Sequence, residues 1–303
     1  MRSVAAPREE RTALGVALMA LAILCFTCID TSAKWLIGAG LPALQVVFIR
    51  YAGHFLLALG ATLPNEGLSV FRSASPVRQF LRSLFLAGST LLNFAALSYL
   101  PITVTTTIMF AGPIVVTLLA IPVLGERVGI HRMLAVCVGF LGVLVVMQPW
   151  GVAFHPAMFL SLGALTCAAS YFVMTRMLAG VESNATSQIW GAGLPTLLLA
   201  PLALPGWVAP DGPGALVVMA LIGAFGAVGH TVATTAHRLA DASILAPVVY
   251  IQIFLAALAG ILVFDTWPTI WTLGGGIIII AAGLYIWHRE RRRGRTMPQV
   301  PRP

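Results

Sequence analysis

Apolar stretches near the length needed to cross a bilayer recur from one end of this chain to the other. A membrane-spanning helix needs about 20 mostly apolar residues. Of the 303 residues, 59% are hydrophobic and only 9% are charged, whereas a soluble domain usually carries about a quarter charged residues. A chain so poor in charge cannot cover a water-facing surface. The sequence therefore predicts an all-α integral membrane protein, with the lipid bilayer as its surroundings.

Charged or Gly/Pro-rich breaks separate the apolar runs, so the spans can be counted. The count predicts ten transmembrane helices, at 12–37, 42–62, 80–98, 102–124, 131–149, 156–178, 187–206, 214–236, 242–264 and 268–288. Residues 1–11 form an N-terminal tail, and residues 289–303 form a basic C-terminal tail.

The basic residues indicate the orientation of these helices. Sixteen of the eighteen Lys and Arg residues lie in alternate connections and in the two tails, and only Lys34 and Arg50 lie elsewhere. Positive residues near membrane helices stay in the cytoplasm. Both termini are therefore expected in the cytoplasm. The net charge of +8 is explained by this orientation, so it does not indicate nucleic-acid binding.

The two halves of the chain resemble each other. Residues 99–126 match residues 239–265 at an offset near 139, and residues 164–178 match residues 22–36. This divides the chain into repeats at 12–149 and 156–288, each with five predicted helices. An odd number of helices reverses the second copy in the membrane, and inverted repeats are typical of secondary transporters.

Several motifs resemble the EamA family of the drug/metabolite transporter superfamily. They are "QVVFIRY" in the second span, "LPITVTTTIMFAGPIVVTLLAIPVLGERV" in the fourth and "GFLGVLVV" in the fifth. The Gly125-Glu126 pair, with Pro113 thirteen residues before the Glu, is the most family-specific part. The second half departs from it, with Phe264-Asp265 in place of Gly-Glu and Gln252 at the position of Pro113.

The resemblance covers residues 12–288 and implies a multi-pass permease of the bacterial inner membrane, with a central cavity between the repeats. Asp30, the Arg50-Tyr51 pair and the short loops are most similar to the branch that includes riboflavin permeases. We therefore expect alternating-access transport of a small polar metabolite, with a vitamin such as riboflavin as the first candidate. Export of amino acids or related metabolites stays open, as do proton coupling or uniport, and a monomer or a homodimer.

An integral-membrane enzyme is the rival interpretation. Such enzymes need clustered acids or histidines to hold a metal or activate a nucleophile. The sequence has no D-x-x-D or H-x-x-x-H arrangement, and its acids are scattered. We expect neither catalysis nor a cofactor or metal.

Polar residues inside membrane spans are candidates for function. Asp30 and Arg50 lie at similar depths in the first two spans, so their spacing allows a salt bridge, of either structural or functional role. Lys34 and Arg82 are expected to extend toward lipid headgroups. Pro113 is expected to interrupt the fourth span. A coupling proton would reside on Asp30 or His230. The expected substrate-binding set is Asp30, Arg50, His54, Asn93, Thr103, Tyr171, His230, Tyr250 and Gln252.

Overall fold

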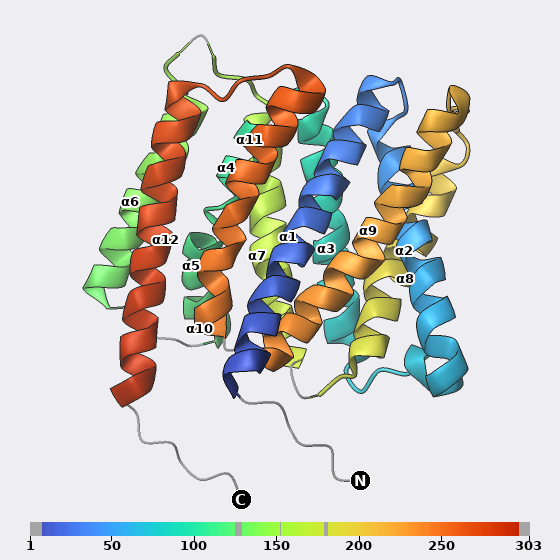
Figure 1. Cartoon of the computed structure of the whole chain (residues 1–303), viewed down its shortest axis with the longest axis horizontal. Coiled ribbons are helices and arrows are strands. Elements are labelled where there is room, and N and C mark those ends of the chain that lie inside the picture. The colour runs from blue at the N-terminus through green and yellow to red at the C-terminus, as the bar shows by residue number, and fades with distance from the viewer. Residues whose placement is uncertain (1–7, 125–128, 152, 179–180, 241, 297–303) are drawn as a thin grey trace, which may run out of the picture.

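The computed structural model describes residues 8–124, 129–151, 153–178, 181–240 and 242–296. Within these ranges every regular element is a helix (Figure 1). Gly125 and Glu126, which carry the most family-specific motif, lie outside the described residues.

A helix occupies each of the ten expected ranges. The continuous helices are α1 (Arg8–Gly38), α2 (Ala43–Glu66), α3 (Pro76–Leu97), α6 (Ile130–Met147), α7 (Met158–Leu178), α8 (Asn184–Ala203), α9 (Gly212–Leu239) and α12 (Ile270–Thr296). A 3-10 turn, η1 (Gly67–Phe71), follows α2. Across the described chain, eight helical segments are long and apolar enough to cross a membrane. Helix α6 contains only a shorter apolar segment, Met133–Met147, and α8 is not among the eight. Helix α12 continues past residue 288 into the basic tail.

Two of the ten ranges are interrupted. The fourth consists of α4 (Ile102–Met109) and α5 (Gly112–Leu124), and Pro113 lies in the first turn of α5. Proline lacks the N–H that would continue a helix, so the expected interruption at Pro113 is confirmed. The ninth range consists of α10 (Ala242–Leu245), η2 (Ala246–Tyr250) and α11 (Ile251–Phe264). The Phe110 and Tyr250 rings lie 5.5 Å apart, so the two interruptions face each other.

Helices from the two halves of the chain pack in pairs. Helix α1 packs along α9, α3 along α7, and α6 along α12, while α2 contacts both α8 and α9. A Cβ on Gly53 of α2 would lie 3.0 Å from the Cα of Gly223 of α9, so the two backbones touch where a larger residue would separate them. The interior between these helices holds large apolar side chains such as Tyr51, Phe94 and Ile222, all fully buried.

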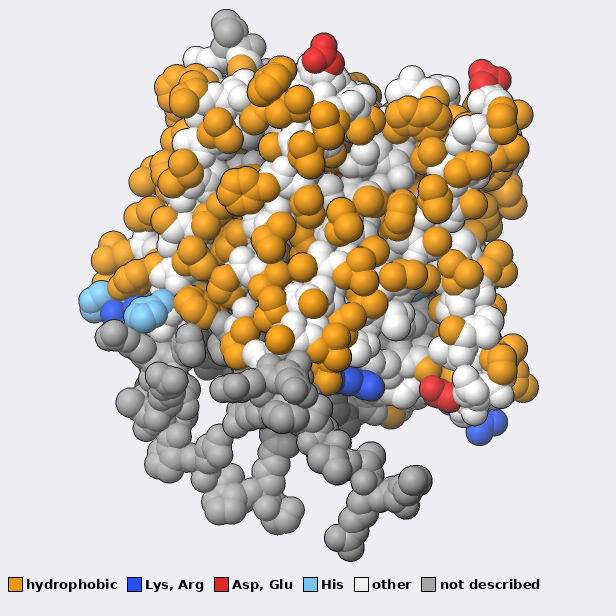
Figure 2. Space-filling model, in the orientation of Figure 1, with side chains coloured by type: hydrophobic (Ala, Val, Ile, Leu, Met, Phe, Trp, Pro, Cys, Tyr) orange, Lys and Arg blue, Asp and Glu red, His pale blue; other side chains and the backbone are white. Residues whose placement is uncertain are grey.

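The side of the bundle is apolar, and charged side chains appear at its two ends (Figure 2). Large side chains such as Phe254 and Leu262 are more than 70% exposed, as lipid-facing residues would be. The chain is thus a multi-pass membrane protein. Helix α1 begins and α12 ends at the same end of the bundle, here called the terminal face, and the other end is called the opposite face (Figure 1).

Candidate functional site

Polar side chains of six helices lie between the two halves of the bundle. They come from α1, α2, α3, α7, α8 and α9, and we call them the polar column. Its members are Asp30, Arg50, His54, Gln79, Arg82, Thr90, Asn93, Tyr171, Thr175, Ser187 and His230. Their contacts divide the column into three levels between the opposite face and the terminal face.

The level nearest the opposite face joins α1, α2 and α3. Asn93 Nδ2 donates to Asp30 Oδ1 over 3.1 Å, and Arg50 Nη1 donates to the Thr90 hydroxyl over 3.2 Å. The Tyr51 hydroxyl lies 2.8 Å from the Thr90 hydroxyl, and the Tyr51 ring packs on the Arg50 guanidinium. Arg50 is only 5% exposed, which places a cation deep in an apolar bundle.

Asp30 and Arg50 do not form the direct salt bridge that their spacing allows. Among the described residues, each makes its side-chain hydrogen bond to α3 instead, Asp30 with Asn93 and Arg50 with Thr90. The two charges are still near enough to interact electrostatically. Both are thus tied to α3, one turn apart along that helix.

Aromatic and imidazole rings make up the middle level. The rings of His54 and His230 are nearly parallel, with centroids 5.5 Å apart, and Phe26 lies 5.1 Å from His230. Helix α9 comes close to its neighbours here because Gly226 faces His54 and Gly229 faces Cys25 and Phe26. His54 follows Arg50 by four residues on α2. His230 lies in the second half of α9.

Arg82 makes most of the hydrogen bonds in the level nearest the terminal face. Its guanidinium donates to the Thr175 hydroxyl over 2.8 Å, to the Tyr171 hydroxyl over 3.0 Å and to the Ser187 carbonyl over 3.1 Å. It also donates to Gln79 Oε1 and packs on the Tyr171 ring at 4.8 Å. Arg82 is 7% exposed, so the expectation that it reaches lipid headgroups is wrong. Partners from α7 and α8 hold it inside instead.

Lys34 also turns inward. Its Nζ donates to the carbonyls of Leu97 and Leu100 over 3.0 and 2.8 Å, and it lies 5.5 Å from the Phe264 ring centroid. The last carbonyls of a helix lack partners within the helix and carry partial negative charge. Lys34 therefore caps the C-terminal end of α3, and its expected role as a headgroup anchor is wrong.

Several proteins named as transporters are similar to this chain in sequence. A protein named "Riboflavin transporter" from Rhizobium johnstonii is 31% identical over 293 residues, covering 96% of each chain. Residues 13–148 match the model of the EamA-like transporter family. The chain belongs to this family. A "Riboflavin transporter" of Vibrio cholerae is 30% identical over 93% of this EamA-like chain and 95% of its own length.

Two further similarities concern a second substrate name and the fold. An "S-adenosylmethionine uptake transporter" of Rickettsia prowazekii is 25% identical over 92% of this chain and 94% of its own length. A crystal structure with 19% identity superposes with a TM-score of 0.61, covering 96% of this chain and all of the other. That structure supports the fold of this EamA family member.

The structure brings together six of the nine expected site residues of this EamA-like chain. Asp30, Arg50, His54, Asn93, Tyr171 and His230 all lie in the polar column. Thr103, Tyr250 and Gln252 lie apart, beside the interrupted helices. Thr103 faces Gly260 of α11, and the Tyr250 hydroxyl rests against Gly283 of α12.

Five members of this site were not expected from the sequence: Gln79, Arg82, Thr90, Thr175 and Ser187. A signal for the first three was present in α3. Gln79, Arg82, Thr90 and Asn93 recur at intervals of three, eight and three residues, which places them on one side of a helix. A polar side on an otherwise apolar span indicates contact with protein rather than lipid.

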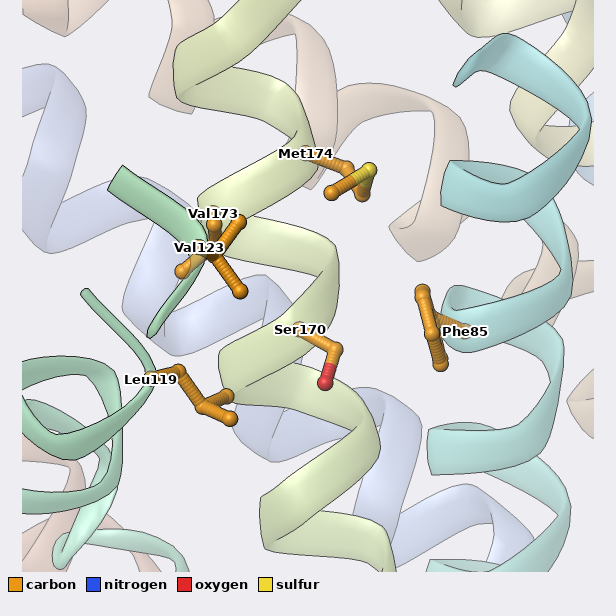
Figure 3. Close-up of a pocket in the computed structure, with 6 residues that line it drawn as sticks. All are labelled: Phe85, Leu119, Val123, Ser170, Val173 and Met174. Carbon is orange, nitrogen blue, oxygen red and sulfur yellow. The ribbon is translucent and has the colours of Figure 1, made fainter. Parts of the chain in front are cut away.

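A pocket of about 100 Å³ lies beside the column, between α3, α5 and α7 (Figure 3). Its lining consists of Phe85, Leu119, Val123, Ser170, Val173 and Met174. The Ser170 hydroxyl already donates to the Thr166 carbonyl, and the other five side chains are apolar. The pocket thus offers little to recognise a polar metabolite, and the polar column remains the candidate site.

Proposed function

We propose that this chain is a secondary transporter of the bacterial inner membrane that moves riboflavin by alternating access of two five-helix inverted repeats. Family membership and relatives named as transporters support a small-metabolite permease. The observation that carries the proposal is the polar column, which places charged and hydrogen-bonding groups between the two halves of an apolar bundle. Such groups mark substrate pathways in membrane proteins.

The helix contacts support the repeat. In the proposed pairing, α1 corresponds to α7, α2 to α8, α3 to α9 and α6 to α12. Exchanging the members of each pair converts the α1–α9 contact into the α7–α3 contact and leaves the α6–α12 and α2–α8 contacts unchanged. The interruptions between α4 and α5 and at η2 also exchange. Discontinuous helices at equivalent positions of two repeats are typical of substrate sites in transporters.

Two polar connections between the halves support alternating access. At the terminal face, Glu182 accepts hydrogen bonds from the Ser73 hydroxyl and, over 2.9 Å, from the Ser75 backbone N–H; we call this the terminal latch. At the opposite face, Gln45 Nε2 donates to the Val208 carbonyl over 2.8 Å, and the Val208 N–H donates to Gln45 Oε1 over 2.9 Å; we call this the opposite latch.

The two latches exchange under the proposed repeat. The terminal latch joins the α7–α8 connection to the α2–α3 connection, and the opposite latch joins the start of α2 to the α8–α9 connection. A substrate that passes between the halves requires one latch to open while the other stays closed. Transporters with inverted repeats rock one half against the other in this way.

A second substrate class is favoured by one observation. Asp30 and Arg50 carry opposite charges at one level of the column, which suits a metabolite with an ammonium and a carboxylate group. Relatives named for S-adenosylmethionine uptake agree with that chemistry. Amino acids and related metabolites, moved in either direction, are therefore the alternative substrates. Cytoplasmic termini, indicated by the basic residues, are part of the proposal.

Transport by purified protein in liposomes tests the function. We expect riboflavin to accumulate in protein-containing liposomes above the level of empty ones, with S-adenosylmethionine and an amino-acid panel measured in parallel. Repeating the assay with an imposed pH gradient decides between proton coupling and uniport, because only coupled uptake follows the gradient. Absence of transport for every solute would exclude the permease, and transport of amino acids alone would replace riboflavin as the substrate.

A further inference from the structure

Two buried polar atoms of the column have no hydrogen-bond partner in the part of the chain that the structure describes. They are Arg50 Nε, which is a donor, and Asn93 Oδ1, which is an acceptor. An unpartnered buried polar atom costs free energy and is rare in folded proteins, so each one calls for an explanation. Both atoms belong to the level nearest the opposite face, where α1, α2 and α3 meet.

The two residues that carry these atoms share neighbours in the fold. Arg50 is bonded to Thr90, and Asn93 follows Thr90 by three residues on the same side of α3. Asp30 links them, since it accepts from Asn93 and interacts electrostatically with Arg50. A donor and an acceptor are thus presented together at one level of the column.

Their roles are fixed by their neighbours. Asn93 directs its amide N–H toward Asp30, because a carboxylate oxygen only accepts, and this leaves the amide oxygen facing away. Arg50 uses Nη1 for the Thr90 hydroxyl, which leaves Nε without a partner. Thr90 itself donates to the Leu86 carbonyl, so its hydroxyl hydrogen is not available to a ligand.

We propose that Arg50 and Asn93 recognise an adjacent carbonyl and N–H of the substrate, as found at the imide edge of a flavin ring. Arg50 Nε donates to the ring carbonyl oxygen, and Asn93 Oδ1 accepts the imide hydrogen. This assignment rests on the proposed function, and it names the part of riboflavin that the site reads. It makes Asn93 a specificity-determining residue.

The two unpartnered atoms, a donor on Arg50 and an acceptor on Asn93, disfavour a simple carboxylate as the ligand at this site. A carboxylate would satisfy Arg50, but it has no hydrogen to offer Asn93 Oδ1. A neutral group that accepts and donates side by side satisfies both unpartnered atoms.

The neighbouring level supplies a surface for the rest of a flat ring. His54 follows Arg50 by four residues on α2, and its ring is stacked with that of His230 beside Phe26. Planar heterocycles stack favourably on such rings. Arg50 Nε and Asn93 Oδ1 are covered in this conformation, so the substrate meets them when opening of the opposite latch separates α2 from the α8–α9 connection.

Uptake by the full-length protein in liposomes tests this proposal with riboflavin and N3-methylriboflavin, which lacks the imide hydrogen. For the native protein, we expect N3-methylriboflavin to compete at least about 10-fold less well than riboflavin. In Asn93→Ala, we expect the ratio of the two apparent affinities to fall to about one, because the acceptor that distinguishes them is gone. The ratio does not depend on how much of the variant folds.

Ser161→Ala is the matched control, because the Ser161 hydroxyl of α7 is also buried without a partner but lies outside the column. It should keep the native ratio. Equal competition by the two flavins in the native protein, with normal riboflavin uptake, would overturn the imide assignment while leaving the transporter function intact. Asn93-dependent uptake of an amino acid in place of riboflavin would overturn it in favour of an ammonium group at Asn93. Failure to transport any solute would overturn the proposed function itself.

Discussion

Two buried arginines lie in the polar column, Arg50 toward the opposite face and Arg82 toward the terminal face, with 5% and 7% of their surface exposed. Both pack on a tyrosine ring, at 4.7 and 4.8 Å. Arg82 donates to four partners among the described residues. Arg50 Nη1 donates to Thr90 and its guanidinium contacts Tyr51, but its Nε has no hydrogen-bond partner in the same part of the chain.

The difference separates a structural cation from one available to a ligand. A guanidinium carries five N–H donors, and an apolar bundle provides no water to satisfy them. Arg82 finds its acceptors in α7 and α8 and thereby joins the two halves of the chain. Arg50 has fewer acceptors among the described residues, and we propose that a substrate supplies the missing one. Under this proposal the two arginines are equally buried but have different roles.

The largest effect is expected for Arg82→Met. The change strands the Tyr171 hydroxyl, the Ser187 carbonyl and Gln79 Oε1 in the bundle, so we expect a loss of about 4 kcal/mol in stability. The yield of monodisperse protein in detergent and its thermal unfolding measure this. Normal yield and unfolding temperature would show that Arg82 is not the structural member of the pair.

Arg50→Met should show the reverse pattern. The bond to Thr90, the packing on Tyr51 and the attraction to Asp30 are lost, so we expect stability to fall by about 2 kcal/mol, less than for Arg82→Met. Riboflavin transport should fall by about 100-fold in kcat/KM, because the free donor is removed. Arg50→Lys serves as the control that retains the charge without the guanidinium. Native-like transport by Arg50→Met would erase the distinction between the two arginines.

Exchanging the charges of Asp30 and Arg50 tests whether the two residues form a direct pair. Because each is bonded to α3 and not to the other, Asp30→Arg combined with Arg50→Asp should not restore folding relative to the single variants. We expect the double variant to remain about 3 kcal/mol less stable than the native protein. Recovery of native yield by the exchange would indicate a direct pair.

The two latches connect the halves of the chain at opposite faces of the molecule. Glu182→Ala should open the terminal face, and Gln45→Ala the opposite face, each shifting the conformational equilibrium by about 1–2 kcal/mol. Labelling of single cysteines introduced near each face, with a membrane-impermeant thiol reagent, measures the shift. Identical labelling patterns in the two variants would contradict opposed latches.

A smaller effect is expected at Lys34, which is partly exposed. Lys34→Met leaves the Leu97 and Leu100 carbonyls without their donor and should cost about 1 kcal/mol. Lys34→Arg preserves the charge and should recover most of this loss. Thermal unfolding of the three proteins in one detergent measures the difference, and an unchanged Lys34→Met protein would exclude the capping role.

The positions of the helices could be predicted from the sequence, because helix formation and membrane insertion depend on local composition. The ten apolar ranges contain helices, and Pro113 marks the interruption between α4 and α5. Six of nine expected site residues meet in the column, because polar groups on apolar spans turn toward protein.

The partners of the buried charges were decided by the tertiary structure alone. The depth of Lys34 and Arg82 along their spans suggested that both side chains reach the headgroups. Instead, Lys34 forms hydrogen bonds to residues 63 and 66 positions away, and Arg82 forms hydrogen bonds to residues 89 to 105 positions away. Depth follows from counting residues, but the direction of a side chain depends on how its helix is rotated and which helix packs beside it. Helix composition thus determined a membrane bundle, and packing between helices determined that Arg82 is satisfied and Arg50 is not.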